Sequence, residues 1–306
     1  MRVSVAHRAE YLGLRLLVRA LGLVSFSRAA NFGARFATLG YRPLGVRRSV
    51  VELQIKAAFP EYGEQEVARV ARGAYEHLGR VAAESTLLPA LGREGILELF
   101  EGADGWHYMD QAMRAGRGLI LVGGHIGNWE AAGAYIAARG VPIDVVARRM
   151  SNPLFDQYLN ETRERMGMTV IYDREAVRRT ARSVQKGRAV AFLADQGVKH
   201  LASTYVPFFG RPAKTPRGPA VFALRWDIPI IFGAAIRQTS GKYRLVLEAV
   251  PVERTGNRDA DVDRVVERFT EILERYVRQT PEQYFWHHRR WRRQEKPKKP
   301  EQVGTT

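Results

Sequence analysis

Apolar and polar residues are arranged in alternating blocks along most of the chain. Short apolar runs occupy residues 118–124, 142–148, 169–172, 189–195, 228–236 and 243–250. Runs of this length are typical of strands buried on both faces of a parallel sheet. Segments with helical periodicity separate or follow them, at residues 128–138, 152–166, 174–185, 217–225 and 261–279. This alternation predicts the α/β class, with a largely parallel central sheet flanked by helices.

The first quarter of the chain has a different texture. Residues 47–59 and 64–88 carry helical periodicity on either side of a short loop, and before them residues 11–26 are mostly apolar. A helix that spans a bilayer needs roughly 20 mostly apolar residues. Arg15 and Arg19 interrupt this segment, and an arginine near the bilayer centre costs about 2.5–3.5 kcal/mol. We therefore predict an amphipathic N-terminal helix that associates with a membrane surface rather than crossing it.

Two stripes of side chains follow the helical repeat of this segment. One stripe consists of Arg8, Leu12, Arg15 and Arg19, and the other of Leu14, Leu17, Leu21 and Val24. Arginines beside an apolar face are typical of a helix that lies in the plane of a membrane interface. An ordinary helix packed on its own domain has the same pattern, so this segment alone leaves both interpretations open.

The charge of the 306-residue chain is concentrated at its two ends. The chain has 48 Lys and Arg against 32 Asp and Glu, a formal net charge of +16. Residues 1–50 contain nine arginines and one glutamate, and residues 287–299 contain seven basic residues and one glutamate. Basic surfaces favour anionic lipid, acidic proteins or nucleic acid. We expect a membrane-associating segment at residues 1–45, one catalytic domain at residues 46–293 and a basic disordered tail at residues 294–306.

The chain contains no cysteine. This excludes disulfides, cysteine-ligated zinc, iron–sulfur clusters and a thiol nucleophile. Any nucleophilic chemistry must therefore use another group, or must pass directly from one substrate to the other.

A histidine follows the apolar run at residues 118–124, in the sequence Gly-Gly-His-Ile-Gly-Asn-Trp-Glu at residues 123–130. Asn128 suits the N-cap of the following helix, and Glu130 falls in its first turn. A carboxylate there could reach one nitrogen of the His125 imidazole, which would make the other nitrogen a general base. A histidine in such a loop is also often only a satisfied polar residue, and the glycines match no phosphate-binding motif.

The same segment resembles the H-x4-D/E motif of glycerolipid acyltransferases, and in particular the H-x-G-N-W-E form of the lipid A biosynthesis acyltransferase family. Further segments resemble that family in the same order, from about residue 11 to residue 293. They are residues 148–156, Arg163, residues 194–196, residues 206–210, residues 214–220 and residues 281–291. With residues 206–220 counted as one motif and Arg163 as a single residue, these segments and residues 123–130 make five motifs, and their common order argues against a chance match.

The resemblance implies the transfer of a fatty acyl chain to a hydroxyl group of a lipid A precursor. The donor it implies is acyl-carrier protein or acyl-CoA, and the acceptor is an anionic glycolipid. His125 would be the base and Glu130 its partner. Substrate binding or catalytic support would come from Arg148, Arg163, Asp195, Asn128, Gln196 and Asn152. Backbone N–H groups of the glycine-rich loop would be donors to the carbonyl oxygen.

The reaction that the resemblance implies requires no cofactor and no metal. Its leaving group is a thiol with a pKa of about 8.5, so it needs no strong general acid either. The resemblance places the protein at the cytoplasmic face of the bacterial inner membrane, as a peripheral or monotopic protein. The apolar segment at residues 206–209 is a candidate wall of the acyl channel, or simply part of the core.

Three other interpretations remain open. Related enzymes acylate phosphatidylinositol mannosides, with acyl-CoA or acyl-carrier protein as donor. A hydrolase could use the same histidine to activate water and would release free fatty acid. The third, which we regard as remote, is a non-catalytic protein that binds nucleic acid through its basic ends.

Overall fold

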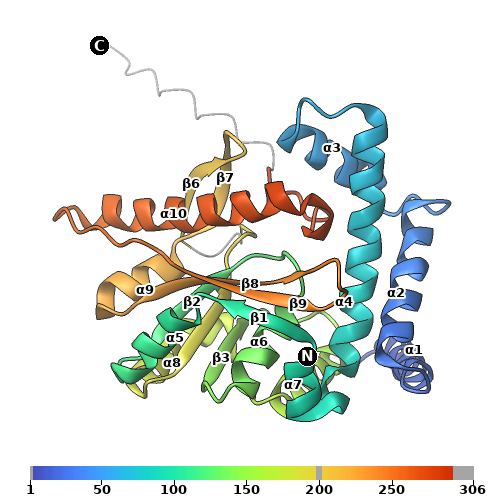
Figure 1. Cartoon of the computed structure of the whole chain (residues 1–306), viewed down its shortest axis with the longest axis horizontal. Helices are drawn as coiled ribbons and strands as arrows, with labels where there is room; N and C mark the ends of the chain where they lie inside the picture. The colour runs from blue at the N-terminus through green and yellow to red at the C-terminus, as the bar shows by residue number, and fades with distance from the viewer. Residues whose placement is uncertain (1–2, 198–201, 292–306) are drawn as a thin grey trace, which may run out of the picture.

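The computed structural model describes residues 3–197 and 202–291. Its centre is a seven-stranded sheet with strand order β1-β9-β8-β2-β5-β3-β4, flanked by helices (Figure 1). Every neighbouring pair is parallel except β8 and β9, which are antiparallel. The predicted α/β class and largely parallel sheet are therefore confirmed. The strands are β1 (Phe100–Asp104), β2 (Leu119–Gly123), β3 (Ile143–Ala147), β4 (Met168–Tyr172), β5 (Ala189–Leu193), β8 (Ile230–Arg237) and β9 (Tyr243–Ala249).

The predicted helices that lie between and after these strands are present. They are α6 (Trp129–Ala138), α7 (Pro153–Arg165), α8 (Ala176–Gln185), α9 (Gly218–Trp226) and α10 (Arg258–Gln279). The helices outside that alternation are α1 (Val5–Leu21), α2 (Phe26–Tyr41), α3 (Arg48–Ala58), α4 (Glu64–Glu98) and α5 (Trp106–Arg114). The pattern did not predict α2, α5, β1 or the separate hairpin of β6 (Ser203–Phe208) and β7 (Arg211–Pro216).

Strand β2 lies at the middle of the sheet and is buried along its whole length. Its side chains alternate between two hydrophobic cores: Ile120 and Val122 face one, and Leu119 and Leu121 face the other. Helices α9 and α10 pack into the first core, and α5 and α6 into the second. A strand with no polar face gives the continuous apolar run seen in the sequence.

Helix α4 runs beside the sheet and α2 packs along it (Figure 1). The two helices approach closely at Gly33 and Gly79, since a Cβ atom at Gly33 would lie 2.4 Å from the carbonyl oxygen of Gly79. Helix α4 continues beyond the predicted end at residue 88, through Pro89, and its regular geometry is broken at Gly92. Segment α2 therefore packs directly on the body of the molecule. The predicted tail at residues 294–306 lies outside the described residues.

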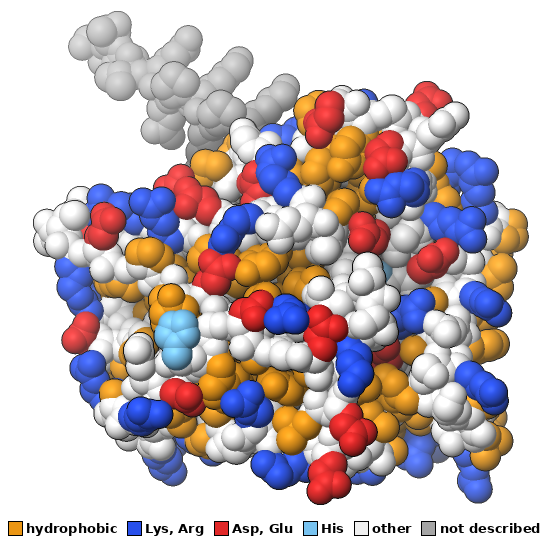
Figure 2. Space-filling model, viewed as in Figure 1, with side chains coloured by type: hydrophobic (Ala, Val, Ile, Leu, Met, Phe, Trp, Pro, Cys, Tyr) orange, Lys and Arg blue, Asp and Glu red, His pale blue; other side chains and the backbone are white. Residues whose placement is uncertain are grey.

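Helix α1 differs in detail from the predicted stripes. It ends at Leu21, so Val24 is not part of it. Leu12, Leu16 and Leu17 are 60%, 61% and 45% exposed, although Leu17 was predicted on the stripe opposite the arginines. At the right-hand edge of Figure 2, where α1 and α2 lie, basic and hydrophobic side chains are interspersed. None of the helices within residues 3–197 and 202–291 is long and apolar enough to cross a membrane.

Candidate active site

The loop that carries His125 leaves the carboxyl end of β2 and leads into α6. The segment after α10 lies alongside it: Ile126 and Tyr284 form an antiparallel bridge, and the Phe285 N–H donates to the His125 carbonyl oxygen at 2.9 Å. The Gly127 N–H donates to the carbonyl oxygen of Gln283 at 3.0 Å. The sequence motif at residues 281–291 therefore fixes the backbone on which the histidine sits.

Gly127 is required by the geometry of this loop. Its φ is +58°, and a Cβ atom there would lie 1.9 Å from the carbonyl oxygen of Ala235. The buried imidazole of His77, on α4, holds the Gly127 carbonyl oxygen at 3.0 Å from Nε2. Burial lowers the pKa of His77 to about 4, so its imidazole is neutral at pH 7 and Nε2–H is the donor to that carbonyl.

Asp195 is the carboxylate that contacts His125. Strands β2 and β5 are parallel neighbours with Gly123 opposite Leu193, so His125 and Asp195 both follow at the carboxyl ends of these strands, on the same side of the sheet. The Nδ1 of His125 lies 2.7 Å from Asp195 Oδ1, and the His125 backbone N–H donates to Oδ2 at 2.9 Å. A proton on Nδ1 is thereby held by Asp195, which leaves Nε2 as the basic nitrogen.

The charge state of Asp195 suits this contact. Burial alone would raise the pKa of Asp195, but the charge of His125 and its two hydrogen bonds lower it to about 2. The carboxylate is therefore ionised at neutral pH and favours the protonated imidazole that forms during base catalysis. The His125 side chain remains 20% exposed, whereas that of Asp195 is 2% exposed. The imidazole is therefore partly open to solvent, whereas the carboxylate is closed off from it.

Glu130 has a different partner, and the predicted contact between Glu130 and the His125 imidazole is wrong. Its two oxygens accept a bidentate pair from Arg163, at 2.5 Å from Nη2 and 3.0 Å from Nε. Burial alone would lower the pKa of the Arg163 guanidinium, but the charge of Glu130 raises it above its usual value. The expected orienting role therefore falls to Asp195, which lies 70 residues from His125 in sequence.

Comparison with known proteins identifies the family. The model of the bacterial lipid A biosynthesis acyltransferases matches residues 4–293. This chain belongs to that family. A lipid A biosynthesis lauroyltransferase of Escherichia coli is 26% identical over 265 residues, which are 86% of this chain and 84% of that protein. A phosphatidylinositol mannoside acyltransferase of Mycolicibacterium smegmatis is 27% identical over 212 residues, 68% of this chain and 67% of the relative.

The other predicted site residues of this acyltransferase divide into two groups. Gln196 and Arg148 lie at the same edge of the sheet as His125: the Gln196 Nε2 is 3.3 Å from Nδ1 of His125, and Arg148 follows β3 and is exposed. Asn152 lies elsewhere, because it caps α7 and donates to Glu10 of α1 at 2.8 Å. The structure thus uses Asn152 to join two helices, not to face the histidine.

Asn128 is the predicted N-cap, and it is completely buried. Its Oδ1 accepts a hydrogen bond from the Ala131 N–H at 2.9 Å, and its Nδ2 donates to Glu84 at 2.9 Å. Both ends of the amide are used inside the protein, so the contacts of Asn128 in this structure are those of a residue that supports the loop.

An apolar cavity adjoins the acyltransferase site. Glu130 and Arg163 form its polar part, and the rest of its wall is made by the sheet and α6. The apolar lining includes Leu121, Ile143, Val145, Met168 and Leu193. The segment at residues 206–209 does not line this cavity, and Val206, Phe208 and Phe209 are buried in the core instead.

Backbone donors from the loop are already used. The N–H groups of residues 125, 126, 127 and 128 donate to Asp195, Gly124, Gln283 and Ala235 respectively. These four N–H groups are therefore not free to bind the carbonyl oxygen of the donor, and for the remaining N–H groups of the loop the expectation stays a prediction. The hydrogen bonds of the four N–H groups hold the loop in shape.

Within residues 3–197 and 202–291, no group of three or more acidic or histidine side chains is arranged to hold a metal ion.

Sequence reasoning missed Glu84, Arg237 and Tyr243, which lie behind the loop. One local signal was available: Glu84 is a charged residue within the apolar repeat of Val81, Leu87 and Leu88 on α4. An acid on a buried helix face needs a partner, and that partner comes from a strand more than 150 residues away.

Proposed function

We propose that this acyltransferase moves a fatty acyl chain from an acyl-carrier-protein thioester to a hydroxyl group of a lipid A precursor. The observation that carries the proposal is the hydrogen bond between His125 Nδ1 and Asp195 at the carboxyl edge of the sheet. Ligands of open α/β sheets bind at that edge. The lauroyltransferase and palmitoleoyltransferase relatives support the acceptor.

In the proposed reaction, Nε2 of His125 removes the proton of the acceptor hydroxyl as its oxygen attacks the thioester carbonyl. The new C–O bond forms, the C–S bond breaks, and the thiol leaves with the proton that the imidazolium returns. Asp195 stabilises the imidazolium and keeps Nδ1 protonated throughout. No covalent acyl-enzyme is needed, which agrees with a chain that has no cysteine.

Positive charge near the site supports anionic substrates. Arg148 is exposed at the carboxyl end of β3 and has no ion pair with any described residue. A guanidinium in this position suits a phosphate of the acceptor or of the donor's pantetheine arm. Acyl-CoA carries the same phosphopantetheine group, so this feature fits either donor.

A phosphatidylinositol mannoside is the second candidate acceptor. Proteins named phosphatidylinositol mannoside acyltransferase are 26% and 27% identical to this chain, as similar as the lauroyltransferase. The longer match to the lauroyltransferase, 86% of this chain against 68%, favours the lipid A precursor.

We also propose that α1 and α2 rest on the cytoplasmic face of the bacterial inner membrane. Exposed apolar side chains on or beside these helices are Leu12, Leu16, Leu17, Leu23, Phe32, Phe36 and Leu39. Arginines on the same two helices supply attraction for anionic lipid. Replacing Leu12 and Leu16 by serine should lower the affinity for anionic vesicles, measured by flotation, by tenfold or more. The reason is that burying two leucine side chains in the membrane contributes on the order of a few kcal/mol. Val177→Ser, on exposed α8, is the control, and equal flotation of both variants would contradict the proposal.

The deciding experiment is acyl transfer by the purified protein in detergent. The donors are a series of acyl-carrier proteins with chains of different length, and the acceptors are a tetra-acylated diglucosamine phosphate lipid and a phosphatidylinositol mannoside. Mass spectrometry should show the sugar lipid with one more acyl chain. His125→Ala should abolish transfer, and His107→Ala, at an exposed position on α5, should not.

The possible products separate the candidates. Acylation of the mannoside alone would replace the first acceptor by the second. Free fatty acid that His125→Ala abolishes would indicate a hydrolase. Wild-type transfer by His125→Ala would exclude the histidine as the base.

A further inference from the structure

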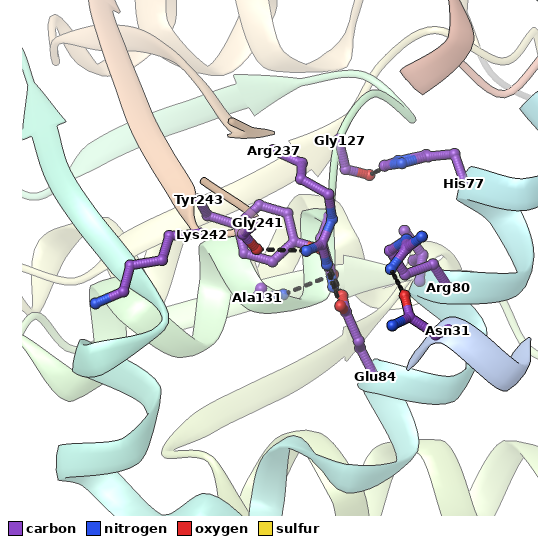
Figure 3. A network of polar contacts seen from close by, with 12 residues as sticks. Asn31, His77, Arg80, Glu84, Gly127, Ala131, Arg237, Gly241, Lys242 and Tyr243 are labelled. Atoms are coloured by element: carbon purple, nitrogen blue, oxygen red, sulfur yellow. Dashed lines mark hydrogen bonds and ion pairs between the residues drawn. The ribbon is translucent and has the colours of Figure 1, made fainter. Parts of the chain in front are cut away.

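A buried ion pair lies directly behind the loop that carries His125 (Figure 3). Glu84, near the middle of α4, is 1% exposed and pairs with Arg237 at the end of β8. The hydroxyl of buried Tyr243, on β9, donates to Glu84 and accepts a hydrogen bond from Arg237 at 2.5 Å. One carboxylate therefore joins a helix to two strands that are far from it in sequence.

Asn128 connects this ion pair to the loop. The Nδ2 of Asn128 donates to Glu84 at 2.9 Å, and Oδ1 accepts from the Ala131 N–H in the first turn of α6. Asn128 is the last loop residue before α6, three positions after His125. The orientation of its amide is thus set by Glu84 on one side and by the helix on the other.

Arg237 holds the loop by a second route. Its backbone N–H donates to the side-chain oxygen of Gln283, and the Gln283 amide donates back to the Arg237 carbonyl oxygen, both at 2.9 Å. The Gln283 carbonyl oxygen then accepts the Gly127 N–H at 3.0 Å. Glu84 and Arg237 therefore reach both residues that immediately precede α6.

Stability alone does not account for this arrangement. Taking two charges out of water is costly, and apolar residues of similar volume often stabilise a fold as well as a buried ion pair does. A buried pair does specify one geometry, because each donor must find its acceptor. Here the geometry that is specified is that of the loop on which the imidazole sits.

We infer that Glu84 and Arg237 are positioning residues that hold the loop at residues 125–128, so that His125 Nε2 faces the acceptor hydroxyl. This inference rests on the role proposed for His125. Neither side chain touches His125. The Glu84 carboxylate acts through Asn128, and Arg237 acts through its ion pair with Glu84 and through the hydrogen bonds of its backbone to Gln283. An error of about 1 Å in the position of a base can lower turnover by about 100-fold.

Glu84→Gln tests the inference, and Asp144→Asn is its matched control. Glu84 accepts from Asn128, Tyr243 and Arg237, and glutamine would place an NH₂ group against at least one of these donors. Asp144 is 3% exposed and also pairs with an arginine, Arg188, but at the opposite edge of the sheet. We expect Glu84→Gln to lower kcat about 10- to 100-fold with KM changed less than about threefold. Asp144→Asn should leave kcat within about threefold of wild type.

Hydrogen exchange of the peptide at residues 121–131 gives a readout that does not need activity. In this peptide, the exchange rate of Glu84→Gln should be at least tenfold higher than that of Asp144→Asn. Both variants are measured at the same number of degrees below their own unfolding temperature. Equal kcat and equal exchange in the two variants would overturn the inference. If Glu84→Gln does not fold, Tyr243→Phe removes one hydroxyl and keeps the ring, and should lower kcat by a smaller factor of about 3 to 10. Wild-type turnover by His125→Ala would overturn the proposed function, while faster exchange in Glu84→Gln would still support the attachment of the loop.

Discussion

A buried carboxylate lies at each end of the parallel strands: one at their amino ends, which we call the amino edge of the sheet, and one at their carboxyl ends, the carboxyl edge. Only the carboxylate at the carboxyl edge is bound by a side chain that can exchange a proton near neutral pH. At the amino edge, Asp144 is 3% exposed and bound by Arg188 at 2.5 and 2.9 Å. At the carboxyl edge, Asp195 is equally buried but bound by His125. Arginine stays protonated at every physiological pH, whereas an imidazole takes up and releases a proton near neutrality. The two buried carboxylates are alike, and only the one paired with an imidazole can take part in the proton transfer that we propose.

The two edges also differ in how firmly they are held. The segment after α10 crosses the carboxyl edge, where it bonds to both sides of the histidine loop and buries Trp286. The amino edge opens on a groove lined by arginines of α8, among them Arg178 and Arg182, both exposed. The loop that carries His125 is therefore held by a second segment of the chain, whereas the described amino-end groove is lined by exposed charged side chains.

The largest difference between the two edges is expected for the substitution Asp195→Asn compared with Asp144→Asn. Asparagine keeps the shape but removes the charge that stabilises the imidazolium and the preference for a proton on Nδ1. We expect kcat to fall about 10²- to 10⁴-fold, against less than about threefold for Asp144→Asn. Steady-state acyl transfer checks this, with thermal unfolding to show that both variants fold. Equal losses in the two variants would contradict the assignment of Asp195.

The pair of Glu130 and Arg163 should behave as one unit. Each is largely buried, with side chains 12% and 18% exposed, and removing one leaves the other unpaired beside the apolar cavity. Glu130→Gln and Arg163→Met should each lower kcat/KM by about 10- to 100-fold. The kcat/KM of the double variant should be no lower than that of the less active single variant, because each single substitution already removes the contact between Glu130 and Arg163. Additive losses would show that Glu130 acts on the reaction independently of Arg163.

The misassignment of Glu130 shows what a single sequence can and cannot supply. The order of the sheet strands and helices from residue 118 onward was predictable, apart from the hairpin of β6 and β7, because strands buried on both faces leave continuous apolar runs. The partner of His125 was not, since it depends on β5 lying next to β2, and strand order is not written in local periodicity. Glu130 is close to His125 in the sequence, but Asp195 is the carboxylate that contacts His125 in the folded protein.

The missed elements have a common physical cause. Strand β1 is an edge strand with the sequence Phe-Glu-Gly-Ala-Asp, and only Phe100 is fully buried. The hairpin of β6 and β7 contains three prolines, and among the described residues its two strands pair only with each other. Such strands carry neither an apolar run nor a clean alternation. Family resemblance supplied the site residues but not their contacts, which arise from packing between distant segments.

Acid should loosen the carboxyl edge before the amino edge. Burial lowers the pKa of His77 to about 4, while an unfolded histidine titrates near 6.5. The unfolded state therefore binds more protons between these values, so the stability that neutral His77 contributes is present above pH 6.5 and is lost as the pH falls toward 4. Asp195, with a pKa of about 2, loses its contribution only at lower pH.

Hydrogen exchange at pH 7.5 and pH 5, corrected for intrinsic rates, measures this difference. The peptide at residues 121–131 should lose about 10- to 100-fold of its protection, given about 1.4 kcal/mol per pKa unit, and His77→Gln should lose less. Exposed His107→Gln is the control and should match wild type. Uniform loss of protection in both edges would show that acid acts on the whole fold instead.

The smallest expected effect compares two exposed arginines, one at each edge. Arg148 follows β3 at the carboxyl edge and Arg182 lies on α8 beside the amino edge, and neither has an ion pair with a described residue. If the anionic groups of the substrates bind beside His125, Arg148→Ala should raise KM about 5- to 10-fold with little change in kcat, as loss of one charge-assisted contact predicts. Arg182→Ala should change neither value.

Added salt should raise the KM of wild type more than that of Arg148→Ala, because the variant lacks the charge that salt screens. A rise in KM for Arg182→Ala alone would move donor docking to the amino edge, and the division between a structural and a chemical edge would no longer hold.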